Sequence, residues 1–344
     1  MSKGFKRQSG LTLVELMVAT TLSLVLLAGV LVVFAANKTT YRMQNGLGTL
    51  QENGRYAMRQ IVSDLQLAGF GGCLSPNLEP KPRVINLVEP SPTTAYLDEF
   101  AGGVFFAGDD DGGSTYGGKA MSAGTDAIEI RGPLRSTVAF VTGEVNAAAN
   151  VTVKDDATGN FAANDFLLIS DCAGADIFQA TNVQLTGGDT AIAHADTGNT
   201  QANLSRAFAA DSVVTGFATH TYFIADTGRT NASGQAITAL YRFDGSSAVE
   251  LVDGVEDLEI QYAGDTGGTG KYPLKDADQL DTAEWAGVTA IRISLLMNSV
   301  EAASAVVAPY TYFPAQDTPI TPAADDFRLR KEFSSLVSVR NAVQ

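Results

Sequence analysis

An acidic residue, Glu15, lies inside an apolar segment near the N-terminus that is expected to form a helix in an apolar environment. Glu15 lies inside the apolar segment 11–17, and residues 16–36 carry no charge. A carboxylate in lipid costs about 2.5–3.5 kcal/mol on insertion scales, so it needs a partner. Gly10 directly precedes the segment. A cut after Gly10 would create an amine at Leu11, and this amine, or that of a neighbouring subunit, could pair with the carboxylate.

Other patterns that could support chemistry are incomplete. A glycine-rich stretch fails as a phosphate-binding loop because Asp265 and Tyr272 stand where such a loop needs glycine and Ser or Thr. The acidic run 109–113 lacks the spacing of a calcium loop, which predicts a solvated turn. His194 and His220 have no cysteine or serine context for a metal site or a triad, so we expect packing or surface histidines. We therefore predict no enzyme activity, no cofactor and no metal site.

The N-terminus has the length of a membrane span. Residues 16–36 would form roughly 31 Å of helix, enough to cross a hydrocarbon core. Three interpretations compete. A secretory signal peptide would have a shorter apolar run, and a plain signal anchor would be oriented by the basic residues of segment 1–10. Only a segment that is cut after Gly10 and kept as an assembly helix explains Glu15.

The helix is predicted to continue beyond the membrane. Small and apolar residues recur at steps of three and four, which places them on one helix face: Leu47, Leu50, Gly54, Ala57, Ile61, Leu65 and Ala68. No proline occurs before Pro76, so we expect one helix from Thr12 to Ala68, ended by the glycines that follow. Its second half is amphipathic and must lie against the downstream domain.

The downstream domain is predicted to be β-rich and acidic. Apolar residues alternate with polar ones at 128–131, 258–262 and 291–298, as in strands with one buried face. Residues 241–251 predict a hairpin and 165–170 an inner strand, while 143–215 predict short strands joined by long loops. The 344 residues carry a net charge of −15.

That charge is unevenly distributed along the chain. Segment 1–10 carries +3 and segment 11–70 carries +1, which leaves −19 for the remainder. Such an acidic domain is a poor general binder of nucleic acid, so no nucleic-acid partner is expected.

The first residues resemble a known export signal. Gly10-Leu11-Thr12-Leu13-Val14-Glu15 after a short basic leader is similar to the class III signal of type IV prepilins. The resemblance implies that the prepilin peptidase cuts after Gly10 and methylates the new N-terminus at Leu11. It also implies a role for Glu15 in subunit assembly. Leu11 departs from the commoner phenylalanine, and Val32 stands where major pilins often have proline.

Longer motifs resemble the PilW family of minor pilins. They are Leu50-Gln51-Glu52-Asn53-Gly54-Arg55-Tyr56-Ala57, Gly69-Phe70-Gly71-Gly72-Cys73, Leu251-Val252-Asp253-Gly254-Val255-Glu256-Asp257-Leu258 and Arg328-Leu329-Arg330-Lys331-Glu332-Phe333. The resemblance implies an α+β, type IV pilin-like fold, with a long N-terminal helix packed on a large antiparallel β-rich head. The predicted divisions are a cleaved leader at 1–10, a membrane-spanning half at 11–36, an amphipathic periplasmic half at 37–70 and a head at 71–344.

The family resemblance also implies a place and partners. The protein would cross the inner membrane once with its head in the periplasm. It would then join other minor pilins at the pilus tip, prime assembly of the major pilin and support a large tip adhesin. Besides these, its expected partners are the prepilin peptidase and the inner-membrane assembly platform. The alternatives are a J-type minor pseudopilin of type II secretion and a tip receptor for a ligand.

Export of the head predicts a disulfide bond between the two cysteines. Cys73 and Cys172 are the two cysteines of the chain, and an oxidising compartment would join them. The bridge would close a loop of about 100 residues, worth nominally ~4–5 kcal/mol. It would tie the end of the helix to the head.

Overall fold

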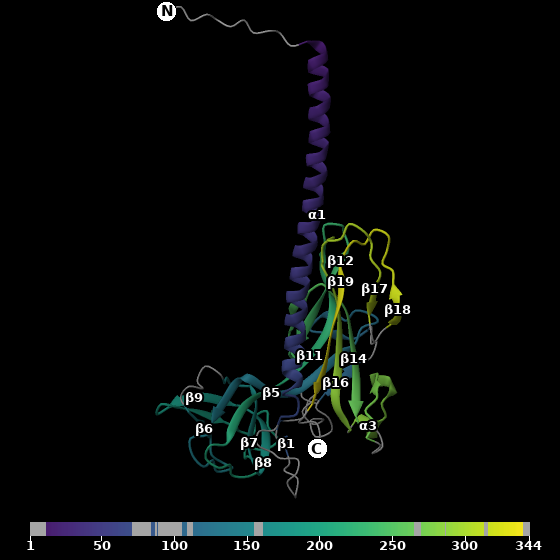
Figure 1. Ribbon diagram of the computed structural model, residues 1–344. Helices are drawn as coiled ribbons and strands as arrows, with labels where there is room; N and C mark the ends of the chain where they lie inside the picture. Colours follow the sequence, from purple (N-terminus) through teal and green to yellow (C-terminus); the bar gives the residue numbers. More distant parts are fainter. Residues whose placement is uncertain are drawn as a thin grey trace, which may run out of the picture.

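A single helix dominates the molecule. The computed structural model describes residues 12–70, 84–86, 88, 105–108, 113–154, 161–264, 270–285, 287–312 and 316–339. Helix α1 (Leu13–Leu65) is 53 residues long, about 80 Å at 1.5 Å per residue. Turns follow it to Gly69, whose φ of 69° suits a glycine that ends a helix. In Figure 1, α1 protrudes from the body for about half its length.

The body is built mainly from two antiparallel sheets. The larger sheet contains β1 (Val84–Asn86), β8 (Gly174–Gln179), β7 (Phe166–Asp171), β11 (Val213–Thr230), β12 (Ala236–Phe243) and β13 (Ala248–Asp253) in that order, with β5 (Ala127–Phe140) and β2 (Phe105–Gly108) joined through β11. The second sheet has the order β15 (Leu274–Lys275), β14 (Val255–Gly264), β16 (Val288–Asn298) and β19 (Arg330–Ser338). Only the β1–β8 pair is parallel among the described pairs of these sheets.

Small elements complete the described part of the chain. They are β3 (Thr115–Tyr116), β4 (Lys119–Ala120), β6 (Val151–Val153), β9 (Asn182–Thr186), β10 (Asp189–Ala193), η3 (Ala277–Gln279), α3 (Thr282–Trp285), β17 (Tyr310–Tyr312) and β18 (Gln316–Ile320). Strands β6, β10 and β9 form a separate three-stranded sheet. Figure 1 shows this sheet with β7 and β8 in a lobe at the far end of α1.

The 18-residue strand β11 links that lobe to the rest of the body. Its first residues, 213–216, pair with β7, and its later residues, 221–230, pair with β12. Along its other edge it pairs with β5. One continuous strand therefore carries the sheet from the lobe to the region that packs on α1.

Two hydrophobic cores and a smaller third cluster around Phe223 and Tyr241 follow from this arrangement. The first joins α1 to both sheets, and the second fills the lobe. Strand β7 separates them, because Leu168 faces the first core while Leu167 and Ile169 face the second. A strand buried on both faces reads as a continuous apolar run, which confirms the inner strand predicted at 165–170.

The sequence patterns match the observed elements. The predicted helix face is confirmed, since six of its seven residues are buried and Leu47 is half-buried. The hairpin predicted at 241–251 is formed by β12 and β13, which pair antiparallel. The chain thus has the α+β class and the long-helix, β-rich architecture that the family resemblance implies.

Candidate functional site

The start of α1 holds the acidic side chain singled out by the sequence. Thr12 is the N-cap, and its hydroxyl accepts a hydrogen bond from the Glu15 backbone N–H at 3.2 Å. The Glu15 carboxylate in turn accepts bonds from the Thr12 backbone N–H and hydroxyl, each at 2.9 Å. This reciprocal capping box satisfies N–H groups that a helix start leaves without partners. Gly10 and Leu11 lie outside the described residues.

The capping box escaped the sequence interpretation. A threonine followed three residues later by glutamate, before an apolar run, is its usual signal, and Thr12 and Glu15 show it. The structure adds that Oε2 of Glu15 lies 2.9 Å from the nitrogen of Thr12. The backbone nitrogen before it in the chain belongs to Leu11, where the predicted cut would place a charged amine.

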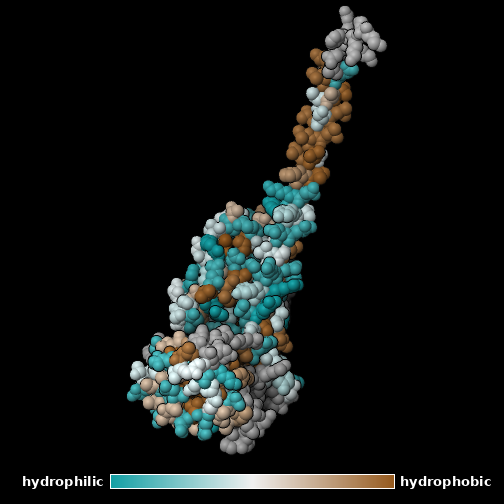
Figure 2. Space-filling model, turned by 90° about the vertical axis from the view of Figure 1, so that its left-hand side faces the viewer, coloured by the Kyte–Doolittle hydropathy of each residue, from teal (hydrophilic) through white to brown (hydrophobic). Residues whose placement is uncertain are grey.

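Beyond Glu15, α1 is an exposed apolar rod. The large apolar side chains between Leu13 and Phe34 are more than half exposed. Figure 2 shows the rod in brown, changing to teal where it approaches the body. Within the described residues, α1 is a helix long and apolar enough to cross a membrane, and none of its most apolar window is buried. This surface has no partner inside the described chain.

The hydroxyl groups of the rod are satisfied by the helix itself. Thr20 and Thr21 both donate to the carbonyl of Met17 at 3.0 Å, and Ser23 donates to the carbonyl of Ala19 at 2.8 Å. An unsatisfied polar group is costly in an apolar medium, and these bonds avoid that cost. The rod can therefore present an apolar surface in spite of its Thr and Ser residues.

The lower half of α1 is fixed to the head by close packing. A methyl group at Gly54 would lie 2.6 Å from Cδ2 of Phe333 on β19, and one at Gly46 would lie 2.7 Å from Cβ of Ala303. Two glycines on one face thus let the helix approach the head closely. Leu50, between them, is 1% exposed and belongs to the first core.

A polar cluster lies near the end of the same helix half. Oδ2 of Asp64 lies 2.7 Å from Nδ1 of His220 and accepts a 2.7 Å hydrogen bond from the hydroxyl of Tyr222; both partners come from β11. Burial raises the pKa of the Asp64 carboxyl, but the bonds from His220 and Tyr222 and nearby positive charge outweigh it and hold the pKa below its ordinary value. His220 is thus a packing histidine that ties helix to sheet.

A cavity of about 230 Å³ opens beside this cluster. Gln60 and Asp64 line it from the helix, and His220 and Arg242 line it from the sheet. Its polar lining also includes the hydroxyl of Ser63 on the helix. The cavity therefore belongs to the junction of stem and head.

The remaining predicted residues do not gather into a site. His194 lies in the lobe, where its ring nitrogens are 2.8 and 2.7 Å from the carbonyl oxygens of Ala202 and Ala149. Cys172, at the β7–β8 turn, is disulfide-bonded. Its predicted partner Cys73 and most of the acidic run 109–113 lie outside the described residues, so the pairing and the solvated turn stay predictions. The described residues contain no group of three or more His, Cys, Asp or Glu that could hold a metal.

Comparisons with known proteins agree with this geometry. Residues 221–341 match the family model described as Type IV Pilus-assembly protein W, and residues 5–31 match the prokaryotic N-terminal methylation motif. No curated protein sequence matches the chain. Among solved structures the chain is similar to a type IV-like pilin from Thermus thermophilus, at 15% identity and a TM-score of 0.20, over 53% of this chain and 87% of that chain.

The methylation motif spans the capping box and most of the apolar rod, and the second match covers β12 to β19 with the greater part of β11. A membrane-anchored pilus component needs both parts, a pilin N-terminus and a folded head. The chain thus combines a prokaryotic N-terminal methylation motif with a region, residues 221–341, that is similar to the type IV pilus-assembly protein W family.

Proposed function

We propose that this chain is a prepilin that is cut after Gly10, methylated at Leu11 and incorporated as a minor pilin at the pilus tip. There it would join other minor pilins, prime assembly of the major pilin and support a large tip adhesin. The observation that carries the proposal is the exposed apolar rod, which begins at the carboxylate of Glu15 and is anchored to a folded head at its other end. The rod is exposed throughout the part of the chain that the structure describes, so lipid or other helices would be its partners.

The position of Glu15 supports processing at this peptide bond. Its carboxylate already contacts the backbone at Thr12, one residue after the proposed new N-terminus. A free amine at Leu11 would place a positive charge near this carboxylate. Pairing with that amine, or with the amine of a neighbouring subunit, would reduce the cost of a charge in an apolar environment.

The two ends of the molecule would then lie in different media. Before assembly, residues 11–36 would cross the inner membrane once, and residues 71–344 would form the head in the periplasm. Residues 37–70 would connect them as the amphipathic half of the helix. An oxidising periplasm would favour the Cys73–Cys172 bridge, which would transmit load from the helix end into strands β7 and β8.

Processing is the first test of the proposal. Full-length protein co-expressed with prepilin peptidase should lose ten residues and gain one methyl group at Leu11, read by mass spectrometry. Gly10→Ala should block or strongly slow the cut. A chain that supports pili with its leader attached would contradict the proposal, and so would a chain that has lost the whole rod.

Assembly is the second test. Glu15→Ala should insert into the membrane normally but reach sheared pili poorly, measured by immunoblot of pilus and membrane fractions. Thr12→Ala is the matched control, because it removes the capping hydroxyl but keeps the carboxylate and should be incorporated almost as the wild type is. Gold labelling of the head should mark pilus ends; labelling along the whole fibre would contradict a tip position.

A further inference from the structure

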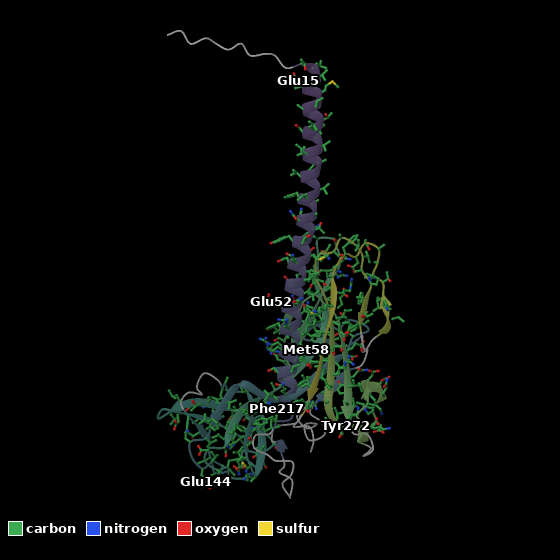
Figure 3. The ribbon with its side chains drawn as sticks, in the orientation of Figure 1. Glu15, Glu52, Met58, Glu144, Phe217 and Tyr272 are labelled. Carbon is green, nitrogen blue, oxygen red and sulfur yellow. The ribbon has the colours of Figure 1, made fainter. Side chains whose placement is uncertain are left out.

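The exposed side of the lower half of α1 carries a row of positive charges. Lys38, Arg42, Arg55 and Arg59, which we call the basic stripe, are all exposed, and Glu52 is the one acidic residue among them. At 100° per residue Lys38 and Arg59 lie opposite the buried face at Leu50 to Leu65, and Arg42 and Arg55 lie on the two flanks of that side. Figure 3 labels Glu52 on the side of α1 turned away from the sheets.

The stripe makes no ion pair within the described part of the chain. None of its four cations forms an ion pair or a side-chain hydrogen bond with another described residue. Tyr41 and Tyr56, which are 70% and 42% exposed, stand on the same side of the helix. Arginine and tyrosine together are typical of protein interfaces, where a planar cation and an aromatic ring form the central contacts.

Lipid headgroups could balance only part of the stripe. Lys38 and Arg42 follow the apolar rod directly, but Arg55 lies 19 residues after Ala36. That is roughly 28 Å further along the helix, beyond the Debye length of about 8 Å at physiological salt. The distal arginines therefore need a partner that stands above the membrane.

The remainder of the chain has the opposite charge. Residues 71–344 carry −19, whereas the stripe together with Glu52 carries +3. The head of the same molecule packs on the opposite side of α1, so it cannot cover the stripe. We propose that the basic stripe docks against the acidic head of a second copy of this chain in the same assembly. This inference rests on the proposed pilin function and adds a contact that the apolar rod cannot supply.

The contact would complement the rod by setting the position of subunits. Apolar packing between two helices of this kind fixes their relative rotation and axial position only weakly, because many registers bury a similar apolar area. Charged pairs at a rim suppress wrong partners and orient the right one. The stripe would thus select neighbours with an acidic head and disfavour basic ones.

The test is charge reversal in the full-length chain. Arg55→Glu with Arg59→Glu should lower the amount in sheared pili about tenfold, because attraction is replaced by like-charge repulsion. Arg55→Lys with Arg59→Lys should keep most of the incorporation. The matched control is Lys154→Glu with Lys271→Glu, which makes the same charge change at two exposed head residues and should be incorporated as the wild type is.

Each outcome decides the inference. Wild-type incorporation of the reversed stripe variant would overturn the docking contact while leaving the pilin function intact. An equal loss in the Lys154 and Lys271 control would show a general charge effect and would also overturn it. A lower membrane level or thermal midpoint of the reversed variant would point to lipid or folding instead. Absence of the wild-type chain from sheared pili would reject the proposed function and this contact with it.

Discussion

The two halves of α1 have the same secondary structure but opposite surroundings. In the upper half, from Leu13 to Ala36, every apolar side chain is exposed, and no other part of the described chain buries it. The lower half has five buried residues and carries the head through its small and apolar face. One helix therefore lies in two environments. It remains a single uninterrupted α-helix from Leu13 to Leu65.

The difference separates the half of α1 that stabilises the fold from the half that is available for assembly. Side chains of the lower half contribute to the stability of the head, because their burial is completed within the chain. Side chains of the upper half can contribute only when lipid or another subunit covers them. Mutations in the two halves should therefore separate folding from assembly.

The largest expected difference is between matched leucines. Leu50→Ala in the first core should lower the free energy of unfolding by about 2–5 kcal/mol, because it removes buried methyl groups and leaves a cavity. Leu26→Ala, at a position 71% exposed, should change it by less than about 0.5 kcal/mol. Unfolding of the full chain in detergent can be followed through Trp285, whose ring contacts Tyr262 at 4.8 Å between centroids.

Equal effects of the two substitutions would remove the distinction between the halves. A large loss with Leu26→Ala would mean that the rod is covered within the molecule, which its exposure contradicts. Incorporation into pili should show the reverse order, with Leu26→Ala the more sensitive of the two variants that still fold.

A smaller effect is expected from the close approach of helix and sheet. Gly54→Ala should destabilise the head by about 1–3 kcal/mol, because the added methyl group meets the ring of Phe333. Gly48→Ala is the matched control: no atom lies within 4 Å of its added methyl group, so the substitution should be neutral or stabilise the helix by up to about 1 kcal/mol. Denaturant midpoints of the two variants measure the difference.

A second substitution can identify the cause. Phe333→Leu should recover part of the loss in the Gly54→Ala background, because a shorter side chain leaves room for the methyl group. If the two effects simply add, the contact between Gly54 and Phe333 is not what limits the approach of helix and sheet.

Local patterns were enough to predict the elements of this fold. The face at Leu50, Ala57 and Ile61 follows from helical periodicity, and the strand at 258–262 follows from alternation, because both periods reflect which side is buried. The pairing of strands that are far apart in the sequence could not be predicted from these local patterns. The 18-residue length of β11 and its shared pairing with β5, β7 and β12 depend on partners far apart in sequence.

The candidate site was predictable for a different reason. Glu15 stands out because a charge in an apolar run is costly wherever the run lies. By contrast, nothing near Asp64 in the sequence indicated His220 and Tyr222, which lie 156 and 158 residues away. Gly54 matched the helix face, but the reason for a glycine there is Phe333, which only the packed structure reveals.

The smallest expected effect concerns pH and the polar cluster at the end of the lower half. The pKa of Asp64 in the folded chain lies below its ordinary value of 3.8, so the native state binds fewer protons than the unfolded state as the pH falls. The stabilisation by Asp64 should be complete above that ordinary value and lost as the pH falls through the lowered pKa. Its size should be about 0.5–1.5 kcal/mol, as for the net contribution of an intramolecular hydrogen bond.

Asp64→Asn isolates this contribution from the other acidic groups of the head. The variant keeps an acceptor for one of the two partners but carries no charge, so it should be less stable than the wild type at about pH 6. The gap should shrink towards pH 3, because the wild-type carboxylate then approaches protonation. Denaturant unfolding across this range measures the gap. A gap that stays constant with pH would show that shape, and not the charge of Asp64, holds the end of the helix to β11, and the two halves of α1 would then differ in packing alone.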